Sequence, residues 1–241
     1  MAPDGSDNLA DYRAHMKELL DDCLTRRDDA DPKKRFARRG VTQEIFDKKR
    51  LIRLFGLVLY EDGHHIDLAA EEHLSCLATK IRGRSRSTGY CNVLATLLSA
   101  RCTDQSLQDF GKGLIGNTES KFLSDEELPL EEDAACEAFG HDDGNSFWEH
   151  QFLFCPVVLI RGDETIYTDS RQSCPLPFCG EPEHIGRGAY AKVYKVRIER
   201  GHLITDPATG SALNVSSPYL SLFDLSFLIP TNLSYSAIGT P

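Results

Sequence analysis

The residues best suited to chemistry begin at Ile185, where the chain reads IGRGAYAKVYKV. The β-branched and aromatic residues here predict two strands, and Gly186 and Gly188 fall at the turn between them. Glycine lets a backbone bend tightly and approach a ligand, and N–H groups in such a turn can donate hydrogen bonds to phosphate oxygens. Tyr190 at the tip could cover the phosphates, while Ile185 and Val193 would flank a purine. The pattern predicts a phosphate-binding hairpin.

This stretch resembles the glycine-rich loop of eukaryotic-type protein kinases, whose pattern is G-x-G-x-x-G-x-V. Gly186, Gly188 and Val193 match that pattern, and Ala191 stands in place of the third glycine. The wider stretch 176–203 is similar to the start of the kinase domain in large fungal protein-kinase-like proteins, which place a helical region before it. The resemblance implies ATP as the ligand, with Mg²⁺ as its metal. The ATP-binding positions that it implies are Ile185, Gly186, Arg187, Gly188, Ala189, Tyr190, Ala191 and Val193.

Two other structures can use such glycines. A dinucleotide-binding fold would place them at the start of a helix, whereas Val193 and Val196 continue a strand, which disfavours that fold. A plain structural hairpin, in which Gly186 and Gly188 serve only the turn, stays open as an explanation that needs no ligand.

The groups that perform phosphoryl transfer in the kinase family are missing from the sequence. The family's nucleotide-anchoring lysine lies on the strand after the hairpin, but no lysine follows Lys195, which shares a strand with Val193. No HRD triplet occurs, so no catalytic aspartate and no metal-binding asparagine can be assigned. Asp109-Phe110-Gly111 spells DFG, but it precedes the hairpin inside a helical pattern and is expected to be coincidental. We therefore expect a catalytically incomplete chain that resembles a kinase truncated after its glycine-rich loop.

Other clusters give weaker chemical signals. The eight cysteines include no C-x-x-C pair, which argues against a zinc site, and free thiols are expected. The acidic stretch 123–140 lacks the spacing and the glycine turn of a calcium loop and predicts the exposed face of a helix. The RGD triplet at 161–163 is expected to be a turn between strands at 156–160 and 164–168, and not an adhesion motif.

Helices are expected before the hairpin. Apolar residues recur at spacings of three and four from Leu9 onward. Thr42 is a candidate N-cap for a second helix. The stretch from Cys91 to Ala100 is almost entirely apolar, which predicts a core helix. The expected helices cover residues 9–20, 42–59, 67–81, 91–100 and 105–114.

Together these elements predict an α+β fold in which helix dominates. Its expected parts are a helical N-terminal region over 1–145, a β-rich segment over 150–215 with the hairpin at 183–200, and an irregular tail over 216–241. The resemblance implies that the small antiparallel β part is the start of a kinase small lobe. The tail differs from the rest of the chain because Asp224 is its single charged residue.

Charge and composition limit the expected partners. The chain has 27 lysine and arginine residues against 37 aspartate and glutamate residues, a net charge of -10, which argues against binding to nucleic acid or to an anionic membrane. No run of about 18 apolar residues occurs, so no membrane span is expected. The first residues are acidic and lack an apolar core, which argues against a secretory signal and favours a cytoplasmic or nuclear location.

Two classes of function remain open. The first is the N-terminal part of a protein serine/threonine kinase with an ATP-binding loop, inactive as this chain, or a related nucleotide sensor without turnover. The second is a non-enzymatic helical module that binds a protein partner. The apolar stretch 147–160, which holds the single tryptophan, separates them, because an exposed apolar surface there would imply a partner.

Overall fold

The computed structural model describes most of the helical region and parts of the chain that follows it. The described residues are 8–24, 35–60, 68–83, 88–115, 124–155, 159–160, 175, 177–187, 191–199, 201–206, 211–212 and 229–230. The expected RGD turn, the expected strand at 164–168 and most of the predicted tail lie outside these residues.

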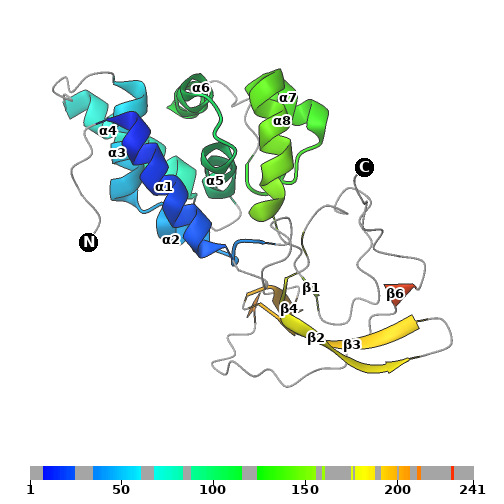
Figure 1. Cartoon of the computed structure of the whole chain (residues 1–241). Helices are drawn as coiled ribbons and strands as arrows, with labels where there is room; N and C mark the ends of the chain where they lie inside the picture. Colours follow the sequence, from blue (N-terminus) through cyan, green and yellow to red (C-terminus); the bar gives the residue numbers. More distant parts are fainter. Residues whose placement is uncertain are drawn as a thin grey trace.

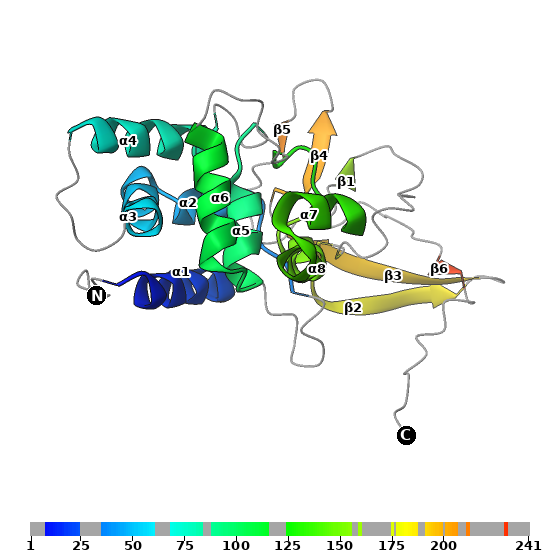
Figure 2. The ribbon, with the colours of Figure 1, turned by 90° about the horizontal axis from the view of Figure 1, so that it is seen from above.

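Helix dominates the described part of the chain, as predicted. The helices are α1 (Leu9–Cys23), α2 (Val41–Ile45), α3 (Lys48–Leu59), α4 (Leu68–Arg82), α5 (Cys91–Ser99), α6 (Asp104–Ile115), α7 (Glu132–Phe139), α8 (His141–His150) and the 3-10 turn η2 (Gln151–Leu153). The strands are β1 (Leu159–Ile160), β2 (Phe178–Arg187), β3 (Ala191–Ile198), β4 (Leu203–Asp206), β5 (Ser211–Ala212) and β6 (Ile229–Pro230). In Figure 1 the helices lie above the strands, and in Figure 2 α7 and α8 are the helices that overlap the strands. None of the described helices is long and apolar enough to cross a bilayer.

The apolar helix α5 lies at the centre of the helical region. Eight of its nine residues are buried, and α1, α2 and α8 contact it. Around it, fully buried side chains such as Met16, Leu54 and Phe147 fill the core. Because each large apolar side chain contributes about 1.5–3 kcal/mol when buried, this core is the main source of stability in the helical region.

The expected single helix from Thr42 to Leu59 is wrong, because the chain forms two helices there. The Asp47 carboxylate accepts the backbone N–H of Arg50 at 2.8 Å and so caps the start of α3. Thr42 lies inside α2 and caps nothing. Its buried hydroxyl donates instead to the side-chain oxygen of Asn92, at 2.7 Å.

The DFG triplet lies within α6, where Phe110 and Gly111 serve packing and Asp109 is exposed. The Phe110 side chain is fully buried, and its ring lies 6.2 Å from the rings of both Phe55 and Tyr90. A Cβ atom added to Gly111 would lie 2.9 Å from the Phe55 ring. The glycine therefore lets α6 approach α3 closely, which explains the triplet without kinase chemistry.

The strands form two small sheets. β2 pairs with β3 as an antiparallel hairpin, and β6 continues that sheet beside β3. β4 pairs with β5 in antiparallel orientation and with β1 in parallel orientation. The β1–β4 pair differs from the expected purely antiparallel part. Parallel pairing needs a long connection, which the chain between residues 160 and 203 provides.

The helical region extends past the expected boundary at residue 145. α8 runs to His150 and η2 to Leu153, although Gly144 is a poor helix former. Gly144 faces α7 at very short range, because a Cβ atom added there would lie 2.5 Å from the Cα atom of Cys136. The glycine weakens the helix signal in the sequence, yet it is what allows α7 and α8 to pack together.

Replacing Gly144 with alanine should destabilise the protein by about 1–3 kcal/mol, because the added methyl group would meet the α7 backbone, which cannot move aside cheaply. The matched control is Gly111→Ala, where the neighbours are side-chain atoms of Phe55 and Leu59 that can shift. The loss of stability in Gly111→Ala should be smaller, because these side chains can move and the α7 backbone cannot. Both variants gain about 1 kcal/mol in helix propensity, so that gain does not affect the comparison. Urea unfolding followed by circular dichroism measures both. A Gly144→Ala variant as stable as the wild type would contradict the close packing of α7 and α8.

Candidate functional site: the glycine-rich hairpin

The predicted ATP-binding positions lie at the end of the β2–β3 hairpin that carries the connecting turn. Ile185, Gly186 and Arg187 end β2, while Ala191 and Val193 belong to β3. The connecting residues, Gly188, Ala189 and Tyr190, lie outside the described residues.

The strand register brings the two ends of the glycine motif together. Gly186 pairs with Val193, and Arg187 pairs with Lys192. The register shifts between His184 and Gly186, which marks a β-bulge at the glycine. A glycine inside a strand often marks such a bulge or the close approach of a ligand. The arrangement is therefore an irregular hairpin end in which the glycine and the valine of the motif lie opposite each other.

The space beside Gly186 is open. A Cβ atom added to this residue would have no heavy atom within 4 Å, in contrast to Gly144. Packing within the described residues therefore does not explain why glycine occurs here. The open space would admit a ligand atom against the backbone.

Two basic residues occupy paired register positions at the same end of the hairpin, in a chain whose net charge is -10. The register places Arg187 directly opposite Lys192. Like charges at directly opposite positions of an antiparallel pair destabilise it. A bound anion would offset that repulsion, so the arrangement suits a phosphate. The sequence motif did not reveal this pair, because it depends on the register.

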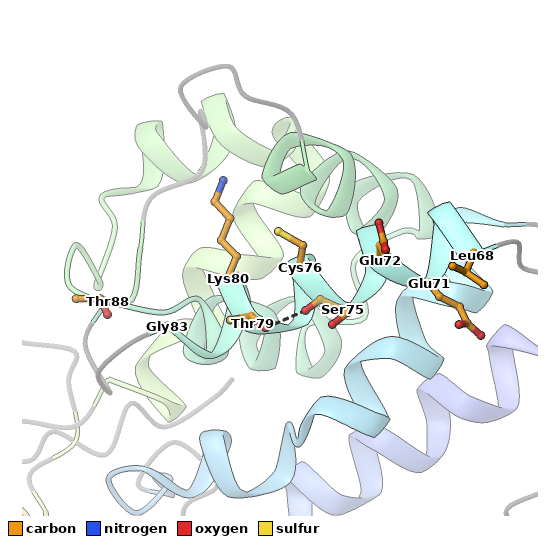
Figure 3. Close-up of a pocket in the computed structure, with 9 residues that line it drawn as sticks. All are labelled: Leu68, Glu71, Glu72, Ser75, Cys76, Thr79, Lys80, Gly83 and Thr88. Atoms are coloured by element: carbon orange, nitrogen blue, oxygen red, sulfur yellow. Dashed lines mark hydrogen bonds between the residues drawn. The ribbon is translucent and has the colours of Figure 1, made fainter.

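A hollow along α4 is a second candidate site. Its volume is about 1120 Å³, and Figure 3 shows that α4 supplies most of its lining side chains. Glu71 and Glu72 lie at one end of it. Lys80, the one cation among its described lining residues, donates its Nζ hydrogen to the Leu114 carbonyl at 2.9 Å. The two carboxylates would repel phosphate, so this hollow suits a nucleotide less well than the hairpin does.

Three of the described cysteines have raised pKa values. Six are free thiols, which confirms the expectation for those whose side chains are described. Burial raises the pKa of Cys91 and of Cys102 to about 12, and that of Cys23 to about 11. These thiols therefore stay protonated near neutral pH and are poor nucleophiles. Among the described residues, no group of three or more His, Cys, Asp or Glu side chains is arranged to hold a metal ion.

Two aspartates with shifted pKa values serve the helices. Asp125 accepts the backbone N–H groups of Asn92 and Val93 at 2.9 and 3.0 Å and so caps α5 from a distant part of the chain. Asp143 accepts from the hydroxyls of Thr103 and Ser106 at the start of α6, at 2.6 and 2.5 Å. Partial burial would raise the pKa of Asp143, but these hydrogen bonds lower it below its ordinary value. Both carboxylates have structural roles, which the acidic composition of their stretches did not reveal.

The apolar stretch that begins at Phe147 belongs to the core. Phe147 and Phe154 are buried, and Trp148 is half-buried, with its ring edge-on to Phe152 at 6.1 Å. The described part of this stretch therefore offers no exposed apolar surface of the kind that would imply a protein partner.

Comparison with known proteins identifies no relative. No protein-family model, curated protein or solved structure matches the chain.

Asp125 should make stability depend on pH in a defined direction. Burial raises its pKa from 3.8 to about 6, against the opposing effect of the N–H groups that it accepts. A raised pKa means that the folded state binds the proton more tightly, so this contribution to stability is full below about pH 4 and is lost as pH rises through about 6.

The Asp125→Asn variant keeps an acceptor oxygen and removes the charge. We expect it to be more stable than the wild type at pH 7, by up to about 2–3 kcal/mol, and the difference to vanish near pH 4. Thermal unfolding at several pH values measures this difference in stability. Asp125→Ala leaves the N–H groups of Asn92 and Val93 without an acceptor, so it should be less stable than the wild type at every pH tested. A wild-type protein that gains no stability relative to Asp125→Asn on acidification would contradict the shifted pKa.

Proposed function

We propose that the β2–β3 hairpin is the nucleotide-binding glycine-rich loop of a protein serine/threonine kinase small lobe, with the helical region as a domain that precedes it. Mg-ATP is the proposed ligand. The phosphates would approach the backbone at Gly186 and the turn that follows it, and Ile185 and Val193 would flank the adenine.

The observation that carries the proposal is the register of the hairpin end. A kinase-type loop needs its first glycine and its valine on facing strands, so that a nucleotide can lie against both. Gly186 and Val193 are directly paired, next to a bulge and an open space. The bulge accounts for a strand glycine without any ligand, but the pairing with valine and the open space beside the glycine are also what a kinase-type loop needs.

The facing cations support phosphate as the recognised group. Arg187 and Lys192 are paired beside the glycine turn. A triphosphate carries several negative charges, and backbone N–H groups with cationic side chains are the usual protein partners of such a group. A phosphate at this end of the hairpin would lie beside the open backbone at Gly186 and near two basic residues, in a chain whose net charge is negative.

Catalysis is not proposed for this chain. No lysine follows Lys195 in the sequence, and no HRD triplet supplies a catalytic aspartate. Phosphoryl transfer depends on positioning and on neutralising the charge of the phosphates, so a loop without those partners should bind weakly. We expect a dissociation constant for Mg-ATP no tighter than about 1 mM, or about −4 kcal/mol. The free thiols fit a reducing compartment, so we propose the cytoplasm or the nucleus as the location.

Nuclear magnetic resonance with Mg-ATP at several millimolar tests the proposal on the full chain. We expect chemical-shift changes at the amides of Gly186, Arg187, Lys192 and Val193 and none within α5, because only the hairpin end would contact the nucleotide. Mg-tripolyphosphate should reproduce the changes at Gly186 and Arg187 but not those at Val193, which depend on the adenine.

The Gly186→Val variant should lose these shifts, because its side chain fills the space that the ligand would use without meeting a neighbour in the fold. The matched control is His184→Val, an exposed position on the same strand, which should keep them. The proposed site would be refuted if Mg-ATP caused no chemical-shift changes at the hairpin amides, or if it caused the same changes in Gly186→Val.

A further inference from the structure

The hairpin is attached to the helical region at its base, the end opposite the glycine turn. Phe178 and Ile198 form the last register pair there, and the Glu199 N–H donates to the Pro177 carbonyl at 2.8 Å. Pro177 is buried, whereas His184, further along the hairpin, is exposed. Figures 1 and 2 show this base turned toward the helices and the other end pointing away.

A tight turn after β3 brings one histidine into the contact. The His202 N–H donates to the Glu199 carbonyl at 3.2 Å, and Gly201 in this turn has φ 86, which favours glycine. The turn leads directly into β4. His202 therefore lies between the hairpin and the second sheet, at the point where the chain meets the helical region.

The His202 side chain is completely buried against residues from the other end of the sequence. Its Nε2 atom accepts the backbone N–H of Arg39 at 3.1 Å, and its ring lies edge-on to the buried Phe36 ring, 5.7 Å between centroids. The Arg39 guanidinium reaches the Gly201 carbonyl at 3.5 Å. A nitrogen that accepts an N–H carries no proton, so the ring is neutral, with its proton on Nδ1.

The segment that receives His202 is itself fixed in the helical region. The Ala37 N–H donates to the Leu153 carbonyl at 2.7 Å, and Ala37 also forms an isolated β-bridge with Leu24, just after α1. Arg38 forms an ion pair with Glu44 in α2 at 2.9 Å. The segment is thus tied to α1, α2 and η2, and His202 contacts it there.

We propose that His202 is a positioning residue, which anchors the base of the hairpin to the helical region and thereby sets where the glycine-rich loop is held. A two-stranded hairpin alone is at best marginally stable in water, so it depends on contacts of this kind. The role assigned to the loop rests on the proposed function. The anchor itself requires no nucleotide.

Hydrogen exchange of the full chain without nucleotide tests the anchor. His202→Leu keeps an apolar side chain but removes the acceptor, whereas His202→Gln keeps an acceptor at a similar reach. In His202→Leu we expect the Arg39 amide and the β3 amides to exchange about tenfold faster, since one hydrogen bond and its packing are lost. In His202→Gln the Arg39 amide should stay within about threefold of the wild-type rate. The control is His184→Leu, the same substitution at an exposed position of the hairpin. It should change the hydrogen-exchange rate of the Arg39 amide by less than about threefold.

The α5 amides report whether a variant still folds, and they should keep their wild-type protection. Unchanged β3 exchange in His202→Leu would overturn the anchor. If that variant fails to fold, hydrogen exchange of the wild-type chain provides the test. Two segments that are anchored to each other open in the same event. The Arg39 and β3 amides should then show equal protection and the same dependence on low urea, and independent opening would overturn the proposal. Since no nucleotide is present, failure here leaves the proposed ATP site untouched.

Discussion

Burial of α5 sets the arrangement of the helices around it. An apolar helix with eight of its nine residues buried must be covered on every side, and α1, α2 and α8 supply that cover. Its first N–H groups must also find acceptors away from bulk water, which Asp125 provides at 2.9 and 3.0 Å. The segment around Asp125 is therefore held against the start of α5. α7 and α8 come next in the chain, and α8 packs against α5. The second carboxylate cap, Asp143, joins α8 to the start of α6.

The helices that could be predicted are those whose signal is local. The run of apolar residues in α5 and the regular spacing in α1 each point to a helix without reference to the rest of the chain. The break between α2 and α3 was not predicted, because Thr42 lies inside α2 and caps nothing, whereas Asp47 caps the start of α3. The helix α8 was missed because Gly144 weakens its propensity, and its benefit appears only where α7 approaches. The parallel pairing of β1 with β4 joins residues more than forty apart and has no local signal.

The same division between local and distant information applies to the site. The glycines, the tyrosine and the valine of the proposed loop are visible in the sequence as a spacing pattern, and their assignment to a loop of this kind stays a prediction. Neither the pairing of Arg187 with Lys192 nor the contact of His202 with Arg39 could be, because the first needs the register and the second joins residues 163 apart. The hairpin consequently combines an end with paired basic residues and an open space beside Gly186 with a base that contacts the helical region. Such a base would restrict how a loop of this kind moves when a ligand binds.

Photolabelling of the full chain tests nucleotide binding at the hairpin most directly. An ATP analogue with an azide on the adenine ring, irradiated with Mg²⁺ present, forms a covalent bond to whatever lies beside the base. We predict that peptide mapping will find the label within residues 185–196 and that excess ATP will suppress it. A label confined to the helical region, such as the hollow lined by Glu71 and Glu72, with the hairpin unmodified, would contradict the proposed site.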